Sequence, residues 1–127
     1  MISILLPIFN NEETIKIVLN SIIKNVNKND EIIIIDDCST DNSYLIIRSI
    51  IKKYKLLKII IMQNKKQMGI SYSLNKGIKR ASKKYIARID GDDINFKNRF
   101  KFQLRVLKEN PKIDLLSCAK KDYKNLK

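Results

Sequence analysis

Three carboxylates stand close together in the stretch IDGDDINF, at Asp90, Asp92 and Asp93, directly after the apolar run YIARI. This concentration of negative charge is unexpected, because 26 Lys and Arg against 13 Asp and Glu give the chain a formal net charge of +13. Clustered carboxylate oxygens are the ligands that Mg²⁺ and Mn²⁺ prefer. In isolation the stretch is equally consistent with a solvent-exposed turn, so the surrounding elements must decide between a metal site and a turn.

Five short apolar blocks, rich in isoleucine and without polar alternation, are typical of strands covered on both faces. They span residues 2–7, 31–37, 57–62, 84–90 and 112–118. Between them, apolar residues at helical spacing predict four helices, in NNEETIKIVLNSIIKNV, STDNSYLIIRSIIKKY, GISYSLNKGIKRAS and NRFKFQLRVLKEN. The regular alternation of strand and helix predicts an α/β fold with three layers, α/β/α, around a mostly parallel sheet.

Polar residues follow three of the predicted strands. The first strand ends in Pro7-Ile8-Phe9, the second in Asp36-Asp37, and the fourth in the acid cluster. In an open α/β sheet, ligands bind beyond the carboxyl ends of the strands, at the point where the strand order reverses. If the first and fourth strands are neighbours, these three ends face one crevice, and this placement favours the metal site over the exposed turn.

Several other sites for phosphates or metals are excluded. The turn PIFNNEE contains no glycine and two acids, so neither a GxGxxG motif nor a P-loop follows the first strand. An EF-hand would require Gly at Asn95 and Glu at Lys101. Because Cys38 and Cys118 lack CxxC spacing and the chain has no histidine, a zinc site of the usual kind is excluded. A divalent cation held by the acids would instead neutralise the phosphates of a ligand.

The composition predicts one globular domain. The chain has 127 residues, of which 44% are hydrophobic and 31% charged. The start MISILLPIFNNEE lacks the basic segment of a signal peptide, and no apolar run reaches membrane-spanning length. We therefore expect a cytoplasmic protein, with association at the inner face of the membrane as a further option. The scattered lysines indicate a solvated surface that also suits anionic membrane surfaces or phosphate-bearing substrates. A continuous basic stripe with interleaved aromatics, typical of nucleic-acid interfaces, is absent.

The segments SILLPIFNNEETI, EIIIIDDCSTDNS, GISYSLNKGIKRASKKYIARIDGDD and NRFKFQLRVLKENPKIDLLSC occur in the order found in family 2 glycosyltransferases. Over nearly its whole length the chain resembles the nucleotide-binding part of their GT-A fold, and it is similar to a subgroup that builds bacterial surface polysaccharides and lipo-oligosaccharides. The resemblance implies a single nucleotide-sugar-binding domain over residues 1–127, truncated at its C-terminus. It also implies metal-assisted, inverting transfer from a nucleotide-diphosphate sugar, in the first place a UDP-sugar, to a carbohydrate or lipid-linked acceptor.

The resemblance assigns the nucleobase pocket to the ends of the first two strands. Pro7 and Phe9 would line the pocket, with Phe9 stacking on the base. Asp37 would accept a hydrogen bond from the base, typically from uracil N3, and Asp36 would support it. Two purely structural alternatives stay open for these residues. Phe9 is also consistent with a core aromatic, and Asp37 with a cap for the helix that starts in STDNS.

The same resemblance assigns the diphosphate and the metal to the acid cluster. Asp90 would contact the nucleotide sugar, and Asp92 and Asp93 would bind Mn²⁺ or Mg²⁺ through the diphosphate. Asn75 and Gly77 would sit in a segment that closes over the nucleotide. For Asn75 a plain helix-surface position is an equally good interpretation.

Three features depart from the family pattern. Cys38 stands where the family usually has Gly in DDGSTD, and Lys97 stands near the usual Pro of the PxRF segment. The family's general base lies in a motif beyond this chain, so no catalytic residue is assigned. Three hypotheses follow: a glycosyltransferase, a non-catalytic nucleotide-sugar-binding module, and a basic nucleic-acid-binding domain.

Overall fold

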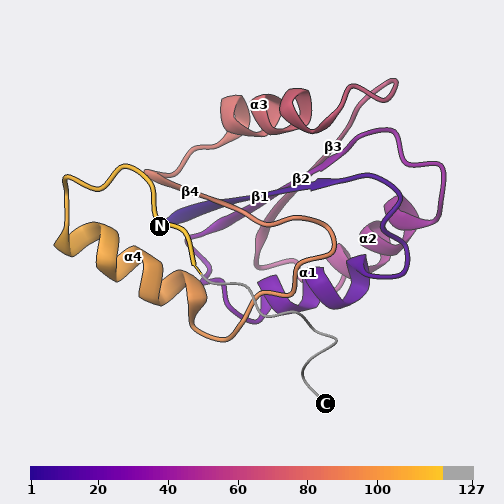
Figure 1. Ribbon diagram of the computed structural model, residues 1–127. Helices are drawn as coiled ribbons and strands as arrows, with labels where there is room; N and C mark the ends of the chain where they lie inside the picture. Colours follow the sequence, from indigo (N-terminus) through magenta and orange to yellow (C-terminus); the bar gives the residue numbers. More distant parts are fainter. Residues whose placement is uncertain (119–127) are drawn as a thin grey trace, which may run out of the picture.

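The computed structural model describes residues 1–118, which form a four-stranded, fully parallel sheet (Figure 1). The strands are β1 (Ile2–Ile8), β2 (Glu31–Asp36), β3 (Lys58–Gln63) and β4 (Tyr85–Arg88). Their order in the sheet is β3-β2-β1-β4. All residues of β1 and β2 are buried, as expected for central strands that read as unbroken apolar runs.

Four helices cover the two faces of the sheet (Figure 1). They are α1 (Ile15–Ile23), α2 (Ser43–Ile51), α3 (Ile70–Arg80) and α4 (Arg99–Glu109). Helix α3 lies alone on one face, whereas α1, α2 and α4 lie on the other. The predicted three-layer α/β/α arrangement is therefore confirmed.

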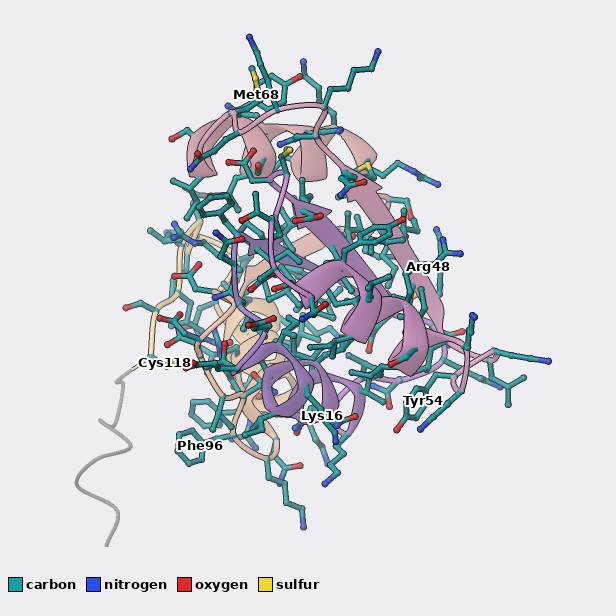
Figure 2. All side chains as sticks on the ribbon, turned by 90° about the vertical axis from the view of Figure 1, so that its right-hand side faces the viewer. Lys16, Arg48, Tyr54, Met68, Phe96 and Cys118 are labelled. Atoms are coloured by element: carbon teal, nitrogen blue, oxygen red, sulfur yellow. The ribbon has the colours of Figure 1, made fainter. Side chains whose placement is uncertain are left out.

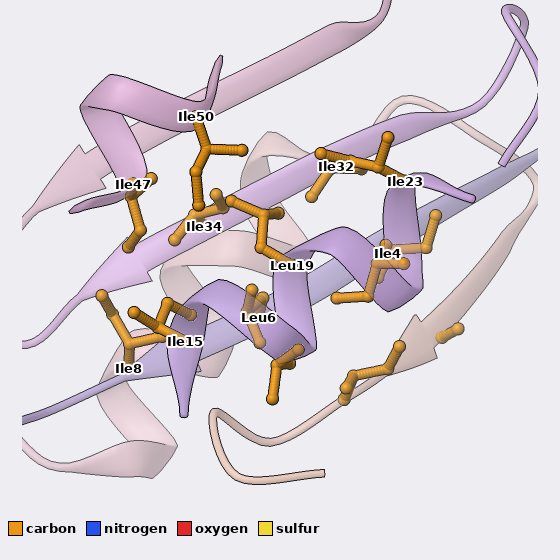
Figure 3. Packing of buried hydrophobic residues seen from close by; sticks show 14 of the residues in the cluster. Ile4, Leu6, Ile8, Ile15, Leu19, Ile23, Ile32, Ile34, Ile47 and Ile50 are labelled. Atoms are coloured by element: carbon orange, nitrogen blue, oxygen red, sulfur yellow. The ribbon is translucent and has the colours of Figure 1, made fainter. Parts of the chain in front are cut away.

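The larger part of the core lies between the sheet and α1, α2 and α4. Figure 3 shows α1 crossing β1 and β2, with Ile15 and Leu19 packed on Leu6 and Ile34. Residues Ile4, Leu6 and Ile34 are completely buried. Because burial of one such side chain contributes about 2 kcal/mol, this face supplies most of the hydrophobic stabilisation of the described residues.

The face under α3 has a smaller core, built on Leu5, Ile33 and Ile35. Gly77 allows α3 to approach the sheet closely, because a Cβ at this position would lie 2.8 Å from Ile35 Cδ1. The buried side of α3 is therefore made by Gly77 and Ser73. Ile78, an apolar residue of the predicted helix GISYSLNKGIKRAS, remains 49% exposed.

The predicted fifth strand at 112–118 is wrong. Residues 112–118 form no strand, and Leu115 is 89% exposed. A strand needs the backbone groups of a neighbour, and the sheet ends at β4 within the part of the chain that the structure describes. The other strand predictions are confirmed to within two residues at each end.

Long basic side chains cover much of the remaining surface. Figure 2 shows Lys16 on α1 and Arg48 on α2 projecting away from the core. Across residues 1–118, none of the helices combines the length and the apolar character needed to cross a bilayer.

Candidate functional site

The carboxyl ends of β1, β2 and β4 meet at one edge of the sheet, because these strands are parallel neighbours. The last contacts along them are short: Asp37 N donates to Ile8 O at 2.9 Å, and Ile89 N donates to Leu5 O at 3.0 Å. The segments that follow the three strands therefore begin side by side. The adjacency of the first and fourth strands, on which the predicted crevice depended, is confirmed.

Pro7 lies where β1 and β4 separate. The carbonyl of Leu5 points to β4, and the carbonyl of Ile8 points to β2. Because the backbone groups of successive residues point to alternate sides of a strand, those of Pro7 point to the side of β4. The β1–β4 pairing ends at Leu5 and Arg88, so the missing N–H of Pro7 costs no hydrogen bond in the sheet. The proline thus coincides with the point at which β4 turns away.

Phe9 follows directly and is 39% exposed, so it is not a core aromatic. Its backbone N–H donates to Asn11 Oδ1 at 2.9 Å, which fixes the turn that carries the ring. The ring is thus presented at the edge of the sheet where the three strands end.

Asp36 and Asp37 point to opposite faces of the sheet. Asp36 is completely buried and accepts hydrogen bonds from Ser39 N at 3.0 Å, from Ser39 Oγ, and from Gln63 Nε2 at 2.8 Å. All these partners belong to the protein. Asp36 therefore holds the turn after β2 in place and has no exposed surface.

Asp37 is 5% exposed and lies on the α3 side. Its Oδ1 accepts hydrogen bonds from Asn64 Nδ2 at 2.7 Å and Met68 N at 2.8 Å, and its Oδ2 accepts one from Gly69 N at 2.7 Å. Burial alone would raise the pKa of Asp37, but the hydrogen bonds from Asn64, Met68 and Gly69 outweigh it and hold this pKa below its ordinary value. The carboxylate is thus ionised, and Oδ2 keeps one acceptor position.

The alternative role of Asp37 as a cap for the helix in STDNS is not what the structure shows. Its backbone partners, Met68 and Gly69, precede α3, not α2. Sequence reasoning missed this contact and the role of Asn64, because residues 37 and 64–69 are brought together only by the parallel pairing of β2 with β3.

Cys38 keeps the backbone conformation that a glycine would favour. Its φ of 64° lies in the left-handed region, which costs an L-residue about 1 kcal/mol or more. The departure from the DDGSTD pattern thus leaves the turn after β2 intact and strained at a single residue.

The loop between β4 and α4, residues 89–98, is called the acid loop below. Arg88 pairs with Asp90 through two contacts, Nε to Oδ1 at 2.8 Å and Nη2 to Oδ2 at 3.2 Å. The hydrogen bond to Asp90 raises the pKa of Arg88, and the nearby charge of Asp93 adds to this. Asp93 N closes a turn on Asp90 O at 3.0 Å. Asp92 is exposed at the tip of this turn.

A cleft of about 370 Å³ joins the acid loop to the turns that follow β1 and β2. Its lining residues are polar or acidic, and they are Asn10, Asn11, Glu12, Glu13, Thr14, Asp41 and Asp92. The structure therefore brings Asp92 together with residues that the sequence analysis did not select.

The two turns of this cleft are joined by reciprocal hydrogen bonds just before α1 and α2 begin. Glu12 N donates to Asp41 Oδ2 at 2.9 Å, and Asn42 N donates to Glu12 Oε2 at 2.9 Å. Asn10 Oδ1 also accepts from Thr40 N at 2.9 Å. The signal for this exchange was present in the sequence, since NNEE and STDNS both have the composition of helix starts. That each turn bonds to the other is decided only by the fold.

Asn75 is exposed on α3 and makes no side-chain hydrogen bond within residues 1–118. The structure does not bring it to the acid loop, and its assignment to the nucleotide stays a prediction. Gly77, by contrast, has a packing role against Ile35.

The acid loop has the donor atoms that Mg²⁺ or Mn²⁺ requires, namely carboxylate oxygens at an exposed position. Within residues 1–118, however, no group of three or more Asp, Glu, Cys or His side chains is arranged to hold a metal alone. The residues therefore fit a cation that takes a few protein oxygens and completes its shell with phosphate oxygens and water. They do not fit a site closed by the protein.

Comparison with known proteins identifies the family. Residues 3–126 match the family described as Glycosyl transferase family 2. An uncharacterized glycosyltransferase of Rickettsia conorii is 38% identical over 109 residues, which cover 86% of this chain and 17% of that protein. The UDP-Glc:alpha-D-GlcNAc-diphosphoundecaprenol beta-1,3-glucosyltransferase WfgD of Escherichia coli is 30% identical over 110 residues, which cover 87% of this chain and 42% of that protein.

Solved structures agree with the fold. TarS (residues 1–349) of S. aureus in complex with UDP-GlcNAc has a TM-score of 0.78 and 27% identity, over 87% of this chain and 32% of that one. The mannosyltransferase PcManGT of Pyrobaculum calidifontis in complex with GDP-Man and Mn²⁺ has a TM-score of 0.89 and 19% identity, over 94% and 35%. The chain thus spans less than half the length of each of these proteins. Its fold, its motifs and the extent of the match place it in glycosyl transferase family 2.

Proposed function

We propose that this chain binds a nucleotide-diphosphate sugar, in the first place a UDP-sugar, with Mn²⁺ or Mg²⁺, and that it forms the donor part of a glycosyltransferase. The observation that carries the proposal is that the segments bearing Phe9, Asp37 and the acid loop all begin at the same edge of the sheet, after three neighbouring parallel strands. TarS, which is 27% identical, was crystallised with UDP-GlcNAc, and this supports a nucleotide sugar as the ligand.

The nucleobase would occupy the β1–β2 side of this edge. The exposed ring of Phe9 offers a stacking face. The Asp37 carboxylate is ionised and has an acceptor position left on Oδ2. It would therefore favour a base that presents an N–H donor, such as uracil at N3, over a base that presents only an acceptor there. Pro7 completes the wall, and Asp36 keeps the turn in place.

The diphosphate would lie over the acid loop. Unpaired, its charge would be repelled by Asp92 and Asp93 by about 1 kcal/mol per pair of charges at 4 Å even in water. Asp92 and Asp93 would hold a divalent cation there, which would remove this repulsion and stabilise the diphosphate as a leaving group. Asp90 is held in place by Arg88 and would contact the nucleotide sugar.

The transfer itself would break the bond between the anomeric carbon and the phosphate and form a bond to an acceptor hydroxyl. With inversion, that hydroxyl attacks from the face opposite the diphosphate and loses its proton to a base. We assign no base among residues 1–118. A carbohydrate or lipid-linked acceptor is proposed, since WfgD, 30% identical, is named for a diphosphoundecaprenol acceptor.

Calorimetric titration tests the donor site. UDP should bind in the presence of Mn²⁺ and bind much more weakly after chelation of the metal, and Asp92→Asn should remove this difference. Asp114→Asn is a matched control, because Asp114 is exposed and lies outside the acid loop. Binding that is independent of metal and unaffected by Asp92→Asn would refute the assignment.

Two rival functions make different predictions. A non-catalytic module would bind UDP-sugar but neither hydrolyse nor transfer the sugar, and an assay of free sugar release distinguishes it. A nucleic-acid-binding domain, suggested by the net charge of +13, would bind RNA or DNA with an affinity that falls steeply between two salt concentrations.

We also propose peripheral association with the inner, anionic membrane surface through the loop that joins α2 to β3. It carries Lys52, Lys53 and Lys55, all exposed, and Leu56, which is 92% exposed. Each lysine near an anionic membrane surface contributes about 1 kcal/mol to the free energy of binding to that surface. The protein should sediment with vesicles of phosphatidylglycerol but not of phosphatidylcholine, and Leu56→Ser with Lys55→Glu should weaken this binding. Equal sedimentation of the variant would refute this surface.

A further inference from the structure

The acid loop runs along one side of α1 (Figure 1). Three hydrogen bonds from different parts of the loop join it to side chains of this helix region. Thr14 Oγ1 donates to Gly91 O at 2.8 Å, and Asn95 N donates to Ser21 Oγ at 2.9 Å. Further along, Asn98 N donates to Asn25 Oδ1 at 2.8 Å.

Thr14, Ser21 and Asn25 form one row because they are seven and four residues apart, close to whole numbers of helical turns. Thr14 directly precedes the first residue of α1, and Asn25 lies in the turn after its end. The opposite side of the helix packs into the core through Ile15, Leu19 and Ile22. The core thus fixes the helix, and the row of polar side chains faces the loop.

The side chains of this row have little freedom to turn away. The hydroxyl of Ser21 donates its single hydrogen to Val18 O at 2.7 Å, so an oxygen lone pair is left for Asn95 N. The amide of Asn25 donates to Ser21 O at 2.8 Å while its oxygen accepts from Asn98 N. The side chains of Ser21 and Asn25 are therefore oriented by bonds within the helix region, independently of the loop.

The loop is also close-packed between these ties. A Cβ on Gly91 would lie 2.6 Å from Asn11 Cγ, so the backbone of the loop rests directly on the turn after β1. Asn95 is 3% exposed. Asp92 and Asp93 lie between the ties at Gly91 and Asn95, in a segment too short to adopt many conformations once both ends are fixed.

We propose that Thr14 and Ser21, with Asn25 behind them, are positioning residues that hold Asp92 and Asp93 ready for the metal–diphosphate part of the donor. The inference rests on the proposed function. These side chains act through the backbone of the acid loop. Loss of either tie should let the two carboxylates move, which weakens binding of the diphosphate but not of the base.

The experiment compares UDP with Mn²⁺ against uridine, which lacks the diphosphate, by calorimetry on the full chain. Thr14→Val and Ser21→Ala should each raise the Kd of UDP about fivefold in the presence of Mn²⁺, as expected for one lost hydrogen bond, and change the Kd of uridine less than about twofold. Thr14→Ser keeps the hydroxyl and should restore binding. Ser49→Ala is the matched control, because Ser49 makes the same bond within its own helix, to Ile46 O at 2.7 Å, but contacts no part of the acid loop.

The outcomes separate the two proposals. If the unmodified protein shows no metal-dependent UDP binding, the proposed function itself fails. If it binds and the two variants equal Ser49→Ala, the positioning role is wrong. An equal loss for UDP and uridine would also overturn it, because that result indicates general damage to the fold. Thr14→Val and Ser21→Ala are measured separately, so a folded sample of either one decides the matter.

Discussion

Replacing Glu31 by glutamine removes one negative charge from the amino end of β2 and leaves the shape of the side chain almost unchanged. Glu31 is 1% exposed. Its Oε1 accepts from Ser3 Oγ at 2.7 Å and from Ser82 N at 2.6 Å, and its Oε2 lies 2.6 Å from Lys58 Nζ. One carboxylate thus joins β1, β2, β3 and the segment that leads into β4.

Burial alone would raise the pKa of Glu31, but the hydrogen bonds from Lys58, Ser3 and Ser82 lower it from 4.5 to about 2. Because the folded pKa is below the unfolded one, the ionised group stabilises the fold fully above pH 4.5. This contribution is lost as the pH falls from 4.5 towards 2. The difference in pKa corresponds to ~3 kcal/mol at neutral pH.

Urea unfolding at a series of pH values measures this contribution. Glu31→Gln should lower the free energy of unfolding by about 3 kcal/mol at pH 7, and the difference from the unmodified protein should vanish near pH 2. Glu13→Gln is the control, because Glu13 is exposed and should change stability by less than about 0.5 kcal/mol. A difference between Glu31→Gln and the unmodified protein that stays constant with pH would refute the electrostatic reasoning.

Three further changes test the packing and the site. Cys38→Gly should raise the free energy of unfolding by about 1 kcal/mol, because φ is 64° there, and an unchanged urea midpoint would contradict this. Gly77→Ala should lower it by about 1–3 kcal/mol, because the new methyl group meets the buried Ile35 Cδ1 at 2.8 Å. Thermal melting checks this, and a melting temperature equal to that of the unmodified protein would show that the end of the Ile35 side chain moves aside at no cost. Asp37→Asn should weaken binding of uridine and UDP alike, by about tenfold, because its amide must place a donor where Asn64, Met68 or Gly69 already donates. A titration in which only UDP is affected would argue against a contact with the base.

The basic composition and the acid loop are compatible because the charges are separated in the structure. Most of the acids lie at the carboxyl edge of the sheet, namely Glu12, Glu13, Asp36, Asp37, Asp41, Asp90, Asp92 and Asp93. Several of them hold backbone N–H groups of neighbouring turns. Backbone N–H groups therefore stabilise several of the negative charges at this edge, whereas Asp92 is exposed in the cleft.

The arrangement of strands and helices was predictable from the sequence, since the isoleucine runs of β1 and β2 and the helical spacing around Leu19 and Ile47 are local patterns. The prediction failed at residues 112–118, because an apolar run forms a strand only beside another strand. The sequence also does not reveal that Ile78 is half exposed, because the close approach that Gly77 permits places the small residues of α3 towards the sheet.

By itself, the sequence determined the types of residue available at the ends of the strands: an aromatic ring, two adjacent acids and a cluster of three more. Only the tertiary structure decided which of these are free. Asp36 is buried and bonded to Gln63, and Asp37 accepts a hydrogen bond from the backbone before α3. Asp90 is paired with Arg88, whereas Asp92 is exposed. The physical reason is that hydrogen-bond partners such as Gly69 and Ser21 lie tens of residues away along the chain. They reach the acids and the acid loop only after the parallel sheet and its helices have formed.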